Sequence, residues 1–155
     1  MIILSPIALA ATAPSVTLGA QAVDQKRTAD GATSLARLEG YDGSVRLYDL
    51  AAAAYSPQFA VERGIEEGLR VEIDGFVSKV RDDGTIELSR FLASCCAADA
   101  MPYSVDVALP AGERFKKNQW LLVRGQVVAP PDGKRAYAVT ADEAEPIDRP
   151  VDAYG

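Results

Sequence analysis

Segments in which apolar and polar residues alternate recur along the chain, with turn sequences between them. In such a pattern every second side chain faces a core, because successive side chains of a strand point to opposite faces of the sheet. Asp83-Gly84 and Pro131-Asp132-Gly133 are strong turn sequences. The chain is therefore expected to form five or six short antiparallel strands. The alternating segments span residues 45–48, 69–80, 85–91, 103–109, 120–128 and 134–140.

Two of these segments contain a glycine near the middle, Gly75 and Gly125. A glycine inside a strand indicates a bulge or bend, which a small barrel needs in order to turn a corner. Asp49 is a suitable cap for a short helix through the alanines that follow it, and Pro57 is expected to end that helix. The predicted fold is mainly β, a small antiparallel barrel with one or two short helices. The five-stranded oligonucleotide/oligosaccharide-binding (OB) barrel fits best, and an open sandwich is the alternative.

The first 22 residues carry no charged side chain, and the next 21 are mostly small and polar. About 20 apolar residues can span a membrane, although Pro6 and Pro14 interrupt this segment. A secretory signal, a buried soluble helix and the remnant of a transmembrane segment are the three interpretations. The sequence thus divides into an apolar segment (residues 1–22), a flexible linker (23–43) and an OB-like barrel domain (44–155).

Composition excludes several kinds of chemistry. The chain contains no histidine, so the commonest general base and the commonest zinc ligand are both missing. The formal net charge of −6 argues against a nucleic-acid surface, which requires clustered Lys and Arg. Because 48 % of the residues are hydrophobic, the chain can bury a substantial core.

The two cysteines, Cys95 and Cys96, are adjacent and lie on the connection between two predicted strands, residues 92–102, which we call the thiol connection. With Asp99 they offer two sulfur ligands and one oxygen ligand to a divalent metal such as zinc. They could instead form a strained, redox-active disulfide or pack as small apolar residues. Arg90 and Phe91 precede the connection, and Arg90 could support it by pairing with Asp99.

The motif Arg-Phe-x-x-x-Cys-Cys-x-Ala-Asp-Ala-x-Pro at residues 90–102 resembles the signature of the YcgQ-type family of predicted permease subunits. The resemblance extends over residues 45–155. Three further segments carry it: Gly75-Phe76-Val77, Gln119-Trp120 with Val123-Arg124-Gly125, and Pro146 to Pro150 with Tyr154.

Members of that family usually have transmembrane helices before this domain and are encoded beside a large permease. The resemblance therefore implies that residues 1–22 are a transmembrane remnant. It also implies a location at the cell membrane, with the barrel on the extracytoplasmic side, and a membrane-embedded permease as the partner. The predicted function is a non-enzymatic, membrane-tethered permease subunit that binds a metal ion, with zinc as the candidate, through Cys95, Cys96 and Asp99. A thiol-redox protein that uses the two cysteines is the alternative.

Overall fold

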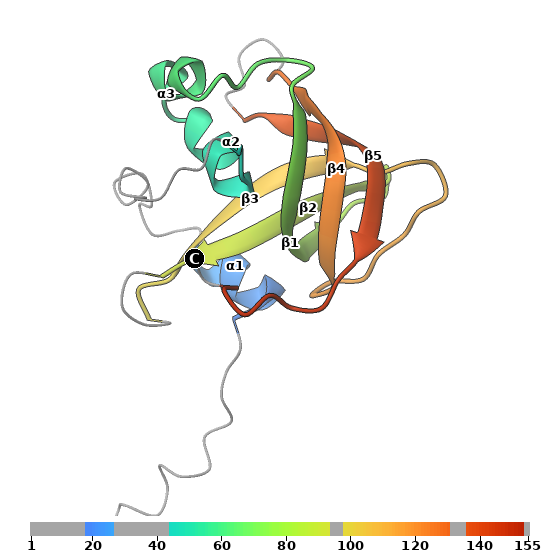
Figure 1. The fold of residues 1–155 in the computed structure, drawn as a ribbon. Helices are drawn as coiled ribbons and strands as arrows, with labels where there is room; N and C mark the ends of the chain where they lie inside the picture. The colour runs from blue at the N-terminus through green and yellow to red at the C-terminus, as the bar shows by residue number, and fades with distance from the viewer. Residues whose placement is uncertain (1–17, 27–43, 94–97, 131–135, 154–155) are drawn as a thin grey trace, which may run out of the picture.

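A computed structural model describes residues 18–26, 44–93, 98–130 and 136–153 (Figure 1). In these residues five strands form a closed barrel in the order β1-β2-β3-β5-β4. β3 and β5 are parallel, and the other neighbouring strands are antiparallel. This arrangement confirms the predicted OB-like barrel. The strands are β1 (Arg70–Val80), β2 (Thr85–Leu92), β3 (Met101–Ala108), β4 (Trp120–Val128) and β5 (Ala138–Pro146).

β1 closes the barrel because it pairs with two different strands. Its first part, Arg70–Phe76, pairs with β4, and its last part, from Phe76 to Val80, pairs with β2. Gly75 lies at this change of partner, where a Cβ atom would come 2.8 Å from the carbonyl oxygen of Ser89. Gly125 on β4 lies at a register shift, and a Cβ atom there would clash with the backbone of Thr140. Both mid-strand glycines therefore mark corners of the barrel, as the sequence predicts.

Apolar side chains from all five strands fill the barrel, and helix α2 (Leu47–Ala53) covers one end of it. Leu47 and Leu50 are almost completely buried among these side chains. The ring of Tyr48 meets the ring of Tyr103 edge to face, with centroids 5.5 Å apart. Helix α2 therefore belongs to the core of the barrel. The strand residues of the core are Val71, Ile73, Val77, Ile86, Leu88, Tyr103, Val105, Val107, Leu121, Val123, Val127, Val139, Ala141 and Ala144.

The predicted strand at residues 45–48 is wrong, because Leu47 and Tyr48 already belong to helix α2. Leu47 and Leu50 lie three positions apart and face the same core, which is helical spacing. Asp49 lies in the first turn of α2, where its Oδ2 accepts a hydrogen bond of 2.9 Å from the backbone N–H of Arg46. It thus caps the helix from its third position and is not the N-cap, which is Arg46.

The last predicted strand, residues 134–140, is also displaced, because β5 spans Ala138–Pro146. The strand therefore includes the acidic stretch after Thr140. Asp142 and Glu143 lie on the outside of the barrel, while Ala141 and Ala144 face its interior. Charged residues can therefore continue a strand when the opposite face supplies the apolar contacts.

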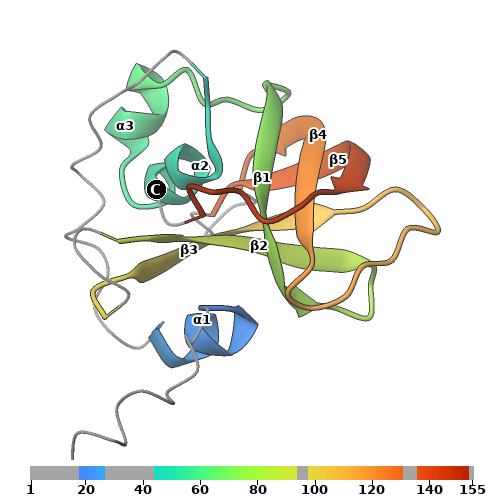
Figure 2. The same ribbon diagram turned by 60° about the horizontal axis from the view of Figure 1, so that its bottom comes forward.

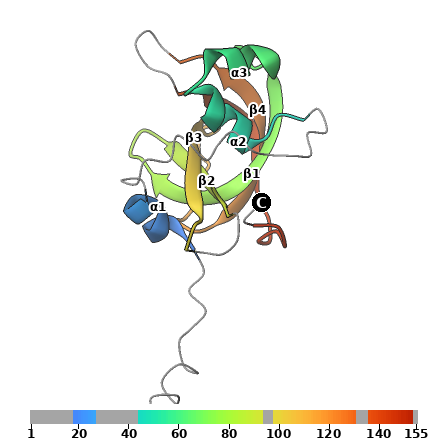
Figure 3. The same cartoon turned by 90° about the vertical axis from the view of Figure 1, so that its left-hand side faces the viewer.

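Two further helices lie outside the barrel, on opposite sides of β2 and β3 (Figures 2 and 3). Helix α3 (Pro57–Glu62) follows α2 and is capped by Ser56, whose hydroxyl accepts a hydrogen bond from the N–H of Phe59. Helix α1 (Ala20–Lys26) packs on the outside of the sheet, against β1 and β3. Among the described residues, no helix combines the length and apolar character needed to cross a membrane.

Candidate functional site

Helix α1 contacts the barrel through its first residue, through its middle and through its last residue. The backbone N–H of Ala20 donates a 2.8 Å hydrogen bond to Oδ1 of Asn118, which lies just before β4. Val23 is completely buried in an apolar cluster with Phe76 and Phe91. Gly19 allows the close approach of Asn118, since a Cβ atom at Gly19 would lie 2.7 Å from Asn118 Oδ1.

This docking crosses the predicted boundary between the apolar segment and the linker. Residues 20–22 belong to a helix that packs on the barrel, and Ala20 is only 4 % exposed. Helix α1 thus includes the last three residues of the predicted apolar segment and the first four of the predicted linker. Residues 1–17 and residues 27–43 lie outside the described part of the chain.

The last residue of α1, Lys26, reaches the thiol connection. Its Nζ donates hydrogen bonds to the carbonyl oxygens of Ala98, at 3.1 Å, and Ala100, at 2.7 Å. Ala100 is fully buried in the same apolar cluster as Val23. Helix α1 therefore holds the part of the thiol connection that enters β3.

Of the three predicted metal ligands, the structure describes only Asp99, which is half-buried in a turn between Ala98 and Ala100. Cys95 and Cys96 lie outside the described residues. The described ranges alone contain no group of three or more His, Cys, Asp or Glu side chains suited to a metal ion. The metal site therefore stays a prediction.

Arg90 and Phe91, the predicted supporting residues, fix the end of β2 from which the connection leaves. Arg90 donates from one nitrogen to both carboxylate oxygens of Asp74, each at 2.9 Å, and from another to the carbonyl oxygen of Asp152, at 2.6 Å. Phe91 stacks on Phe76 with ring centroids 5.7 Å apart. The guanidinium of Arg90 also lies over the ring of Trp120. These contacts join β2 to β1, β4 and the C-terminal segment.

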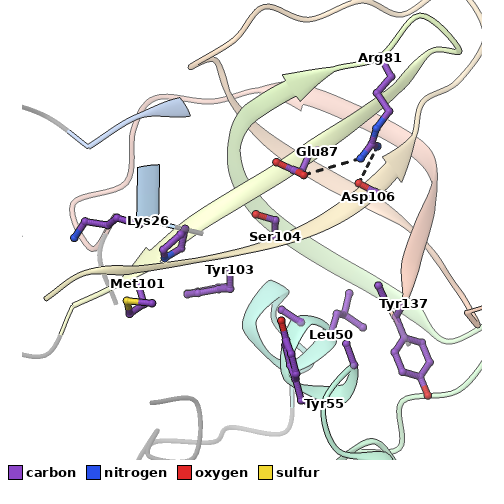
Figure 4. Close-up of a pocket in the computed structure, with 14 residues that line it drawn as sticks. Lys26, Leu50, Tyr55, Arg81, Glu87, Met101, Tyr103, Ser104, Asp106 and Tyr137 are labelled. Carbon is purple, nitrogen blue, oxygen red and sulfur yellow. Dashed lines mark ion pairs between the residues drawn. The ribbon is translucent and has the colours of Figure 1, made fainter. Parts of the chain in front are cut away.

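A pocket of about 530 Å³ opens between α2, β3 and the residues just before β5 (Figure 4). At one end Arg81 pairs with Asp106 at 2.8 Å and lies 4.0 Å from Glu87, and at the other end stands Lys26. Leu50 of α2 forms part of its apolar wall. No local sequence pattern predicts this pocket, because its lining comes from segments that are distant in the chain.

Three tyrosines, Tyr55, Tyr103 and Tyr137, also line the pocket. Burial raises the pKa of Tyr103 to about 12, so its phenol stays protonated at neutral pH. Tyr55 is 65 % exposed and offers an open aromatic face at the rim. The pocket thus presents aromatic rings and paired charges, and its described lining lacks the thiol and imidazole groups that commonly act as nucleophile and base.

The closed five-strand barrel, with one helix in its core and another docked beside the thiol connection, defines this protein as an OB-like β-barrel domain. A comparison with known families matches residues 65–154 to the DUF1980 C-terminal domain. Because this match covers more than half of the chain, the chain belongs to that family, whose name assigns no activity. The family match does not include the permease role that the resemblance to the YcgQ-type family implies.

A comparison with curated proteins gives no match. Among solved structures, one similar chain comes from the crystal structure of the S. pombe Stn1–Ten1 complex, with 14 % sequence identity and a TM-score of 0.38. The similarity covers 70 % of this chain and 79 % of that chain.

Proposed function

We propose that this chain is a non-enzymatic, membrane-tethered subunit of a permease that binds one zinc ion through Cys95, Cys96 and Asp99. One observation carries the proposal. Two residues separate the apolar residues 1–17 from helix α1, whose last residue, Lys26, donates hydrogen bonds to the carbonyl oxygens of Ala98 and Ala100. A tether formed by residues 1–17 would therefore keep the thiol connection close to the membrane and to a membrane-embedded partner.

The donor atoms suit the proposed ion. Zinc accepts thiolate and carboxylate ligands, and two thiolates with one carboxylate provide three of its usual four. The fourth ligand would come from water or from the partner subunit. The turn that carries Asp99 is fixed on both sides by the hydrogen bonds of Lys26, which is what a ligand-bearing turn requires.

Native mass spectrometry of the full chain, purified without chelator, tests the metal site. We expect one zinc per chain, loss of the zinc in Cys95→Ser, and full loading in the control Ser94→Ala, which changes the same connection without removing a thiol. A chain without metal whose mass is lower by two hydrogens would favour the thiol-redox alternative. Reduced thiols without metal in the wild-type chain would contradict both functions.

Membrane fractionation and co-purification test the tether and the partner. We expect the full chain to sediment with membranes on the extracytoplasmic side and to co-purify with a permease encoded beside it. Deletion of residues 1–17 should release the barrel without unfolding it, because α1 keeps its contacts. A full chain that remains in the soluble fraction without a partner would contradict the proposal.

A further inference from the structure

Helix α1 covers an apolar surface that is separate from the core of the barrel. Val23 of the helix is buried there against Phe76 and Phe91. Ala100 and the half-buried Trp120 complete this surface, which we call the docking face. Among the described residues, the cluster that fills the barrel includes none from α1. The barrel therefore keeps its core when α1 leaves, and only the docking face is uncovered.

The docking face contacts three positions on one side of α1. Ala20, Val23 and Lys26 are three residues apart, and residues at this spacing are neighbours on a helix surface. Asn118 accepts a hydrogen bond from the backbone N–H of Ala20, the apolar cluster holds Val23, and two backbone carbonyls accept from Lys26. A Cβ atom at Gly19 would lie 2.7 Å from Oδ1 of Asn118. The docking face therefore selects a short helix that follows a glycine, carries an apolar residue in its middle and ends with lysine.

Every copy of the chain carries a helix that meets these requirements. Helix α1 has seven residues, which is too few for a stable helix away from the docking face. Residues 27–43 separate Lys26 from Ser44, and a segment of that length can extend over up to about 60 Å. A domain of this size has a radius of gyration of only about 15 Å. The length of the sequence therefore permits α1 to reach the docking face of a second copy as well as its own.

We propose that the docking face binds α1 of a second copy, so that two chains exchange these helices and form a two-fold symmetric dimer. Exchange replaces each contact within a chain by the same contact between chains, so little contact energy is lost. A helix joined to its own docking face by a short segment has an effective concentration of about 1 mM. Exchange is therefore expected at high local concentration of the chain, or when its own α1 no longer fits. It depends neither on the metal site nor on the tether of the proposed function.

Two variants of the full chain, kept in a mild detergent, test this exchange. Val23→Asp places a charge in the apolar cluster, so this chain has an intact docking face but no helix that fits it. The double variant Asn118→Gly with Trp120→Ala keeps α1, lacks the cap and the indole, and contains no tryptophan. We expect Trp120 of Val23→Asp to emit at longer wavelength than in the wild-type chain. Addition of the double variant at about 0.1 mM should shift this emission back.

The matched control is the double variant that also carries Val23→Asp, which supplies no fitting helix and should leave the emission unchanged. Native mass spectrometry should show a dimer of the two chains in the first mixture and not in the control. An emission that the double variant fails to reverse would overturn the exchange. An emission of Val23→Asp alone that equals that of the wild-type chain would overturn it too, because Val23 would then not hold α1. Val23→Ala replaces Val23→Asp in both mixtures if circular dichroism shows that the charge unfolds the barrel.

Discussion

At the scale of single residues, polar side chains form a continuous hydrogen-bonded row across three strands. The hydroxyl of Ser89 lies 2.7 Å from that of Ser78 and 2.6 Å from that of Ser104. Ser78 also donates to Oε1 of Glu87 at 2.5 Å, and both residues are buried. Because a buried hydroxyl without a partner is costly, these residues stabilise the outer face of β1–β3 only as a connected set.

The buried phenol of Tyr103 should make the protein sensitive to alkali. Burial raises its pKa from 10.0 to about 12, so the folded state holds the phenol proton more tightly than the unfolded state does. The resulting stability is fully present below pH 10 and is lost as the pH rises from 10 to about 12. We expect roughly 2–3 kcal/mol of the free energy of unfolding to disappear over this range.

Denaturant unfolding at a series of pH values measures this loss. Tyr103→Phe keeps the ring contact with Tyr48 but has no ionisable group, so its stability should fall less between pH 10 and 12. Tyr55→Phe is the matched control, because Tyr55 is exposed at the rim of the same pocket. Equal losses in all three proteins would show that Tyr103 is not responsible.

At the scale of elements, helix α2 completes the barrel core although it precedes the first strand. Its apolar face is buried against β3 and also contacts β1 and β2. Residues 109–119, which connect β3 to β4, form a loop that contains no helix. The end of the barrel is therefore covered by α2, from earlier in the sequence.

Leu50 tests the role of α2, because it is fully buried and also lines the pocket. Leu50→Ala should lower the free energy of unfolding by about 2–5 kcal/mol, since it removes apolar contacts and leaves a cavity. Val61→Ala on the exposed face of α3 is the control and should have little effect. A loss for Leu50→Ala below about 1 kcal/mol would mean that α2 is not part of the core.

At the scale of the whole molecule, α1 and the barrel form one folded unit. Removal of α1 would expose Phe76, Phe91 and the half-buried Trp120, which pack in the cluster beneath it. A chain that starts at residue 18 should therefore unfold at the same denaturant concentration as the full chain. A chain that starts at residue 27 should unfold earlier.

Trp120 is the only tryptophan in the chain, so the fluorescence of the protein shows whether α1 covers this cluster. Its fluorescence should shift to longer wavelength in the chain that starts at residue 27, because water reaches the ring. The chain that starts at residue 18 serves as the control and should keep the emission of the full chain. An unshifted spectrum in both would show that α1 contributes nothing to this cluster.

The sequence by itself determined the class of fold and most of the strands. The alternation of apolar and polar residues is a local pattern that indicates which face of a strand is buried. It predicted the bounds of β4, Trp120–Val128, correctly. The two mid-strand glycines also predicted the corners of the barrel. Local patterns failed where the partner of a segment is distant, as for α2 and for the acidic half of β5.

Only the tertiary structure decided how the candidate site is supported. The sequence singled out Cys95, Cys96, Asp99, Arg90 and Phe91 as a group, but it divided the residues of α1 between an apolar segment (1–22) and a linker (23–43). The contact between Lys26 and Ala98 joins residues 72 positions apart, and the contact between Ala20 and Asn118 joins residues 98 apart. No repeating pattern of apolar and polar residues encodes such contacts, because they depend on how the closed barrel brings distant segments together.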